Sequence, residues 1–385
     1  MWVMPTGAIG GCSRPMPSYP VASRRQMPMM TRPVIDPFTE RTRQTMSNIN
    51  LIARDNGAGL SRDMHLLATL LREGGHDVTI TGLGHRSRLS NRLRRLYARI
   101  RRLVRGWFSG TFNARYDINI MLEHVRPESF DQAHVNILIP NPEWFREEWL
   151  RELTQIDLIF AKTRHAERIF SSLGCRTVFI GFTGNDYLDP DVVRQPTFFH
   201  GPGRSGNKGT MPLLELWAQH PEWPSLTAVW RRKHIELPAM PANVNLIRDY
   251  LPEEELRRLH NASTFHLCPS QTEGFGHSLI ESLSTGCVTI TTDAEPMNEL
   301  VTPARGVVVH AHDAGTQELA TLYDFDLDAM RGAIERCISM SREEQASLGH
   351  AAREWYEAND RSFRQHFLEA IAAAAASAST KRDAA

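Results

Sequence analysis

The sequence has no apolar run long enough to cross a bilayer and contains little cysteine. Spanning the hydrocarbon core takes roughly 20 consecutive apolar residues, and no stretch of the 385 residues approaches that length. The N-terminus also lacks the continuous apolar segment of a secretory signal. The cysteines show neither paired nor metal-ligand spacing: Cys12, Cys175, Cys268, Cys287 and Cys337. These absences favour a cytoplasmic protein without structural disulfides and without a bound metal.

The chain also lacks net charge, since Lys and Arg together number 44 and Asp and Glu together number 44. This balance argues against a general polyanion binder, so we expect no nucleic-acid partner. The charge is nevertheless uneven, because no acidic residue occurs between Val78 and Tyr116. Nine arginines lie between Arg86 and Arg105, and apolar residues recur among them at spacings of four and three: Leu89, Leu93, Leu96, Ile100, Leu103 and Trp107.

This arginine-rich pattern predicts a basic amphipathic helix over residues 86–108. Such a helix suits the surface of an anionic membrane, where each basic residue contributes about 1 kcal/mol. The alternative is a helix whose apolar stripe packs on the protein while its arginines face water. Both interpretations remain open at the level of sequence.

The order of secondary-structure signals indicates an α/β protein of two domains. An apolar strand over residues 48–53 leads through a glycine-containing loop into a helix over 61–74 and a strand over 77–81, the opening of a doubly wound domain. We expect the following organisation: a disordered leader over 1–45, an N-terminal Rossmann-like domain over 46–190, a C-terminal Rossmann-like domain over 191–350, C-terminal helices over 351–371 that cross back to the first domain, and a flexible tail over 372–385. Met46 directly precedes the first strand, which also suggests an alternative start there.

The most informative stretch lies within residues 265–292. A short apolar strand over 265–268 is followed by a glycine turn, a helix over 277–285 and a strand over 287–292. Free amide groups at a helix N-terminus bind anions. Seven residues separate Glu273 on the turn from Glu281 on the helix, and carboxylates accept hydrogen bonds from sugar hydroxyls. A phosphate cradle combined with two carboxylates is what a sugar nucleotide requires.

A second strand-to-helix glycine loop spans residues 201–210 and carries two cations. Arg204 presents a bidentate fork and Lys208 a point charge, and both suit a diphosphate. Gly203 lies directly before Arg204. The simpler alternative is a basic surface turn.

The block over residues 269–301 resembles the nucleotide-sugar signature of glycosyltransferases with the GT-B fold, above all the retaining enzymes of family 4. The resemblance extends over residues 47–367. It implies two Rossmann-like doubly wound domains facing a cleft, and a hexosyltransferase-type enzyme (EC 2.4) that uses a nucleoside-diphosphate sugar, no cofactor and no metal. Arg204, Lys208 and Glu273 are the implied catalytic residues, and the implied donor-binding residues are Gly203, Gly274, Phe275, Gly276, His277 and Glu281.

Acceptor-side candidates come from strand ends of the first domain, because ligands bind at the carboxyl ends of parallel strands. They are Gly57, Gly59, Glu123, His124, Asn141 and Glu143. Each also has a structural alternative, such as a tight turn for the two glycines. For Glu299 we expect a structural role, capping the following helix or orienting a loop. Beyond residue 310 we expect the chain to become helical.

The resemblance leaves three functional interpretations. The first is retaining sugar transfer to a lipid-linked or envelope-polysaccharide acceptor at the inner membrane face. The second is a sugar-nucleotide epimerase or hydrolase on the same fold. The third is an inactive GT-B scaffold that binds membranes or partner enzymes, against which the presence of Glu273, Glu281, Arg204 and Lys208 argues.

Overall fold

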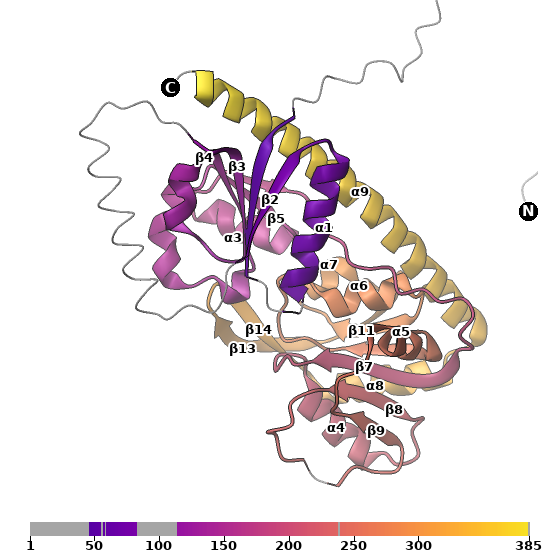
Figure 1. The fold of residues 1–385 in the computed structure, drawn as a ribbon. Helices are drawn as coiled ribbons and strands as arrows, with labels where there is room; N and C mark the ends of the chain where they lie inside the picture. Colours follow the sequence, from indigo (N-terminus) through magenta and orange to yellow (C-terminus); the bar gives the residue numbers. More distant parts are fainter. Residues whose placement is uncertain (1–45, 55–56, 58, 83–113, 238, 384–385) are drawn as a thin grey trace, which may run out of the picture. The chain divides into compact units, whose positions relative to one another are not determined.

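The computed structural model describes residues 46–54, 57, 59–82, 114–237 and 239–383 (Figure 1). The expected leader over 1–45 and the basic helix over 86–108 therefore lie outside the described residues. Among the helices that are described, none is long and apolar enough to cross a membrane.

The first sheet has six parallel strands in the order β2-β1-β3-β4-β5-β6. Its strands are β1 (Asn48–Ala53), β2 (Asp77–Gly82), β3 (Tyr116–Leu122), β4 (Ala133–Ile139), β5 (Leu158–Ala161) and β6 (Thr177–Phe179). The associated helices are α1 (Gly59–Glu73), α3 (Arg164–Ser172) and the 3-10 helices η1 (Pro127–Gln132), η2 (Pro142–Trp144) and η3 (Glu147–Gln155). The strand order reverses between β1 and β3, which places a ligand crevice beyond the carboxyl ends of these two strands.

The second sheet is also parallel, in the order β12-β11-β10-β7-β8-β9. Its strands are β7 (Gln195–Gly203), β8 (Leu226–Trp230), β9 (Val244–Ile247), β10 (Ser263–Cys268), β11 (Val288–Thr292) and β12 (Gly306–Val309). Its helices are α4 (Thr210–Gln219), α5 (Glu253–Ala262), α6 (His277–Ser284), α7 (Met297–Leu300) and α8 (Leu327–Ser339). The order reverses between β7 and β10, so the loops after these two strands meet at the crevice. The predicted α/β fold with two Rossmann-like sheets is confirmed.

The C-terminal region differs from the prediction, because one helix, α9 (Arg342–Asp383), replaces the expected helices and flexible tail (Figure 1). Alanine has the highest helix propensity, and Ala374 and Ala378 are buried against the first domain. An ion pair holds the end of α9, since Nζ of Lys381 lies 2.5 Å from Oδ1 of Asp157. Burial and these contacts order residues 372–383, for which the sequence predicts a flexible tail.

The segment after residue 310 is a β-hairpin rather than the expected helix. Strands β13 (Ala311–Gln317) and β14 (Ala320–Phe325) pair antiparallel. Gly315 and Glu318 have left-handed backbone conformations, with φ of 105° and 54°, and these interrupt a helix. Thr316 in β13, and Thr321 and Tyr323 in β14, favour extended structure.

Glu299 has a structural role, but it caps a different helix from the one expected. Its two carboxylate oxygens accept hydrogen bonds from the backbone N–H groups of Arg164 and His165, each at 2.7 Å. These are the first residues of α3, which belongs to the first sheet. A carboxylate at a helix N-terminus satisfies free amides and complements the helix dipole. Glu299 thus links the two sheets.

Candidate functional site

Lys208 and Glu273 meet at the crevice between β7 and β10. The Lys208 ammonium group forms an ion pair with the Glu273 carboxylate and lies 3.4 Å from Oγ of Ser278. Ser270 Oγ donates to Glu273 at 2.5 Å. The structure therefore brings together a cation and a carboxylate from the two glycine loops that the sequence singled out separately.

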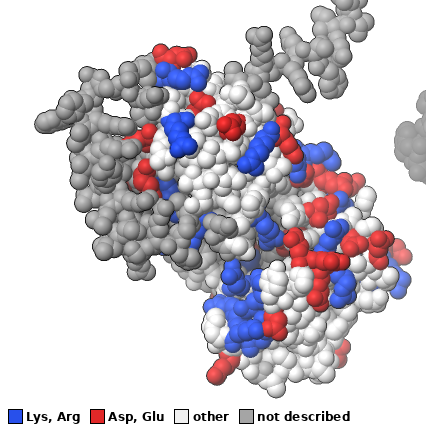
Figure 2. Space-filling model, in the orientation of Figure 1, with Lys and Arg blue, Asp and Glu red and all other residues white. Residues whose placement is uncertain are grey.

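Further cations surround the loop that carries Lys208. Arg204 is exposed on the same loop, and the side chains of Arg231 and Arg232 lie beside Gly203 and Gly206. Figure 2 shows basic side chains gathered in the lower half of the view. The loop therefore offers positive charge to an anion entering from solvent.

Gly274 and Gly276 shape the turn after β10. At Gly276, which precedes α6, φ is 109°, a conformation that side-chain-bearing residues rarely adopt. A Cβ on Gly274 would lie 2.5 Å from Oδ1 of Asn141 and 2.8 Å from Oε1 of Glu143. Phe275 is buried and packs on Phe182, with ring centroids 5.1 Å apart. Two acceptor-side candidates therefore contact the donor-side turn, and the absence of a side chain at Gly274 permits this approach.

His277, the first residue of α6, belongs to a charged cluster with two residues that the sequence analysis missed. Its Nε2 lies 2.8 Å from Oδ1 of Asp63 on α1, and Nζ of Lys162, which follows β5, lies 3.4 Å from Oδ2. Burial alone would raise the pKa of Asp63, but His277 and Lys162 outweigh it and hold that pKa below its usual value. Gly59 lies beside the His277 ring, since a Cβ at position 59 would be 3.4 Å from a ring atom of His277.

Glu281 is also paired across the two sheets, with a second missed residue of α1. Arg62 Nη1 donates to Oε1 of Glu281 at 2.7 Å and to the Tyr187 hydroxyl at 3.2 Å. Burial would lower the pKa of Arg62, yet the net shift is upward because the charge of Glu281 stabilises the guanidinium. The order of sequence signals predicted this helix over residues 61–74, but nothing in the local sequence indicated which of its charged residues face the crevice.

Glu143 on η2 is the most strongly perturbed carboxyl group of the site. Its side chain is 6% exposed, and burial, with smaller contributions from Glu273 and Glu123, raises its pKa to about 7 despite the opposing effect of Lys162. Within the described chain, Oε2 of Glu143 and Oδ1 of Asn141 have no hydrogen-bond partner. Buried polar atoms are normally satisfied, so these two atoms are suited to contact a ligand.

Replacing this carboxyl with an amide, Glu143→Gln, is expected to change how stability depends on pH. The raised pKa means that the folded protein holds a proton that the unfolded chain has lost, so stability falls as pH rises from about 4.5 to about 7. The free energy of unfolding of the variant should therefore gain about 2–3 kcal/mol relative to the wild type between pH 5 and pH 8.5. Urea unfolding at both pH values measures this.

The matched control for that experiment is Glu147→Gln, because Glu147 is exposed on the adjacent helix η3. Its difference from the wild type should not vary with pH. A pH-independent difference for Glu143→Gln would contradict the raised pKa.

The remaining acceptor-side candidates are Glu123, His124 and Gly57. Glu123 has a left-handed backbone, with φ of 62°, a strained conformation for glutamate. Burial raises its pKa, and the nearby charge of Lys162 opposes the rise. His124 packs on Trp149, with ring centroids 5.2 Å apart, and burial together with Arg126, Arg146 and Arg54 lowers its pKa to about 4. His124 is therefore a neutral, packed histidine. Gly57, which lies before α1, has a left-handed backbone conformation.

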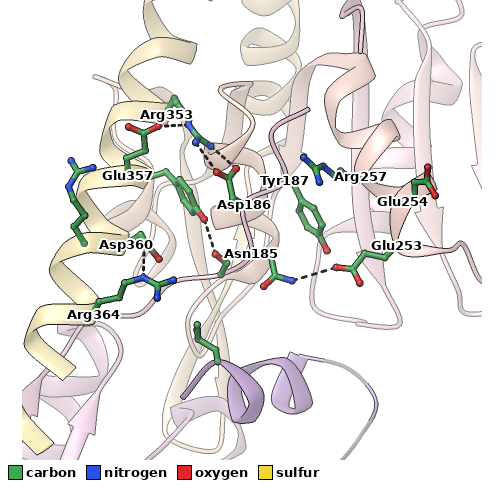
Figure 3. Close-up of a pocket in the computed structure, with 14 residues that line it drawn as sticks. Asn185, Asp186, Tyr187, Glu253, Glu254, Arg257, Arg353, Glu357, Asp360 and Arg364 are labelled. Atoms are coloured by element: carbon green, nitrogen blue, oxygen red, sulfur yellow. Dashed lines mark hydrogen bonds and ion pairs between the residues drawn. The ribbon is translucent and has the colours of Figure 1, made fainter. Parts of the chain in front are cut away.

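A separate cavity of about 730 Å³ lies between α5, α9 and the segment 184–187 (Figure 3). Neither Lys208 nor Glu273 lines it. Its charges are largely paired within the protein: Arg353 contacts both carboxylate oxygens of Asp186 at 2.6 and 2.8 Å, and Arg364 contacts Asp360 at 2.7 Å. We therefore place the chemistry at the crevice and not in this cavity.

Comparison with known proteins bears directly on this crevice. Residues 233–355, about a third of the chain, match the family described as "Glycosyl transferases group 1". The match includes the turn with Gly274 and both glutamates, Glu273 and Glu281. The protein is a glycosyltransferase.

Solved structures agree with the fold of this glycosyltransferase. A glycosyltransferase from Rickettsia africae ESF-5 has a TM-score of 0.62 at 15% identity, covering 84% of this chain and 97% of that one. Sucrose-phosphate synthase from Thermosynechococcus elongatus has a TM-score of 0.60 at 14% identity, covering 83% and 97%. Anabaena Alr3699/HepE in complex with UDP-glucose has a TM-score of 0.58 at 16% identity, covering 85% and 100%. No curated protein matches the sequence.

Proposed function

We propose that this glycosyltransferase moves a sugar from a nucleoside diphosphate to an acceptor hydroxyl with retention of anomeric configuration and without a metal ion. The observation that carries the proposal is the meeting of Lys208 and Glu273 at the crevice, with Glu281 on the helix that follows. The similar Anabaena protein is seen with UDP-glucose, which makes a uridine nucleotide a suitable first probe.

In the proposed reaction, the leaving diphosphate gains negative charge in the transition state. Lys208, Arg204 and the backbone amides at 274–277 stabilise that charge, an electrostatic effect that is often the largest in catalysis. Glu273 accepts hydrogen bonds from the donor sugar and Glu281 from the ribose. The leaving phosphate itself takes the proton of the acceptor hydroxyl, so no protein base is required.

Asn141 and Glu143 form the acceptor wall in this proposal. Both approach Gly274, and each keeps a buried oxygen that finds no hydrogen-bond partner among the residues described. Those oxygens can bind hydroxyl groups of a sugar-like acceptor. A lipid-linked or envelope-polysaccharide precursor is the acceptor class we propose.

The test is a thermal-shift panel of UDP-glucose, GDP-mannose, ADP-glucose and dTDP-glucose with the corresponding diphosphates. One nucleotide should raise the melting temperature, because a ligand that binds only the folded state stabilises it. Release of the diphosphate should then depend on an added acceptor, which separates transfer from hydrolysis or epimerisation. If no sugar nucleotide shifted the melting temperature, the proposal would fail.

We further propose peripheral binding to anionic membranes through residues 86–108, on the basis of their sequence. The full chain should float with vesicles containing phosphatidylglycerol, and the quadruple change of Arg94, Arg95, Arg101 and Arg102 to Glu should abolish flotation, because it reverses the attraction. Equal flotation of both proteins, or of neither, would contradict this proposal.

A further inference from the structure

The β13–β14 hairpin, which the sequence did not predict, contacts the acceptor wall of the first domain. The backbone N–H of Leu319, in the two-residue turn, donates to the carbonyl of Pro142 at 3.2 Å. The Leu319 side chain packs against the apolar cluster that contains Phe145 and Trp149. The tip of the hairpin is therefore anchored beside η2, the short helix that carries Glu143.

The same hairpin is also fastened to the donor side of the crevice. The backbone N–H of Tyr323 donates to the carbonyl of Gln271 at 2.8 Å. The Gln271 side chain donates to Oδ1 of Asp324 at 2.7 Å. The backbone N–H of Gln271 donates to the carbonyl of Asn207 at 3.0 Å. Gln271 precedes Glu273 by two residues and Asn207 directly precedes Lys208, so both donor loops are tied to the hairpin.

Gln317, at the end of β13, joins the two sides with one side chain. Its Nε2 donates to the carbonyl of Glu143 at 2.9 Å. Its Oε1 accepts from Nδ2 of Asn207 at 2.6 Å. One amide group thus contacts the residue that bears the buried acceptor-side carboxyl and the residue next to the donor cation.

We propose that Gln317 is a positioning residue that fixes Glu143 relative to Lys208 for sugar transfer. The inference rests on the proposed function, because it assigns the acceptor to the Glu143 side and the diphosphate to the Lys208 side. Gln317 acts through these two neighbours and does not itself contact the reacting atoms.

Geometry explains why one amide matters for the rate. Reactions between bound groups depend on near-attack placement, and a misplacement of about 1 Å can cost about 10²-fold in rate. Glu143 follows a strand of the first sheet and Lys208 follows a strand of the second, so their separation depends on contacts that cross the crevice. Gln317 donates to Glu143 on the acceptor side and accepts from Asn207 on the donor side, so its one amide group links the two sides.

The test compares Gln317→Leu with the wild type in the full chain. Leucine has a similar volume but makes no hydrogen bonds. Gln345→Leu is the matched control, because Gln345 also donates to a backbone carbonyl, that of Met340 at 2.9 Å, at the start of α9. The probes are the sugar nucleotide selected by the thermal-shift panel and its diphosphate.

We expect Gln317→Leu to lower kcat by at least about tenfold while the Kd of the diphosphate changes by less than about twofold. Wild-type kcat in Gln317→Leu would overturn the inference with the proposed function intact. A wild type that binds none of the nucleotides would overturn both.

A second measurement without ligand distinguishes positioning from general destabilisation. Without the hydrogen bond from Gln317 to its carbonyl, Glu143 should shift and its carboxyl group should become accessible to water; the charged neighbours of that carboxyl group are Lys162, Glu273 and Glu123. The difference in free energy of unfolding between proteins with and without Glu143→Gln changes with pH. That change should be at least halved when both proteins also carry Gln317→Leu. An unchanged pH dependence, with kcat and Kd impaired in parallel, would show a merely structural role and reject the proposal.

Discussion

Lys208→Ala is expected to lower kcat by about 10²-fold or more, the loss typical of removing one oxyanion donor. Its ammonium group is largely enclosed by Glu273 and the first turn of α6, with 14% of the side chain exposed. A cation in such a site acts on the leaving diphosphate with little screening by water. Steady-state release of diphosphate from the selected sugar nucleotide measures the effect.

The control for Lys208→Ala is Lys233→Ala. Lys233 also pairs with a carboxylate, that of Asp249, but its side chain is 69% exposed, and exposed ion pairs contribute little. Its kcat should equal that of the wild type. A raised KM with unchanged kcat in Lys208→Ala would mean that Lys208 binds ground state and transition state equally, and our assignment would be wrong.

Asp63→Ala is expected to lower the free energy of unfolding by about 3–5 kcal/mol, since removing one partner strands a buried charge. Asp63 and Lys162 are each about 5% exposed, and His277 is the third member of the cluster. The pKa of Asp63 is depressed in the folded protein. The stability that its carboxylate contributes is therefore fully present at pH values above the pKa of Asp63 in the unfolded chain. It is lost as pH falls through the folded pKa. Urea unfolding near neutral pH measures the loss.

Two further variants make the Asp63 result specific. Asp191→Ala, at an exposed aspartate, should change stability by less than about 0.5 kcal/mol. The double variant Asp63→Leu with Lys162→Met should be more stable than Asp63→Ala, because it removes both buried charges. A loss below about 1 kcal/mol in Asp63→Ala would show that the cluster contributes little to folding.

Much of the second domain could be predicted from sequence because its signals are local. The strand, glycine turn and helix around Glu273 are contiguous, and each element follows from its own residues. The loop around Lys208 has the same form. The resemblance of residues 269–301 to nucleotide-sugar enzymes therefore identifies the class of chemistry from local sequence alone.

The failures arose where a partner distant in sequence decided the structure. The segment after residue 310 carries no strong hydrophobic period of its own, and its hairpin is held by the distant carbonyls of Pro142 and Gln271, which accept from Leu319 and Tyr323. The alanine-rich end of α9 is ordered by burial against β3 and β4. Glu299 caps α3, a helix more than a hundred residues away in sequence.

The sequence by itself determined the alternation of strands and helices, the two glycine loops and the residue types needed for a sugar nucleotide. Only the tertiary structure decided which charges share the crevice. Arg62 contacts Glu281 and Asp63 contacts His277. These pairs form because α1, which follows β1 of the first sheet, faces α6, which follows β10 of the second. Such pairs form between segments about two hundred residues apart, so no local pattern encodes them. The packing of the two sheets sets their distances, their burial and hence their chemistry.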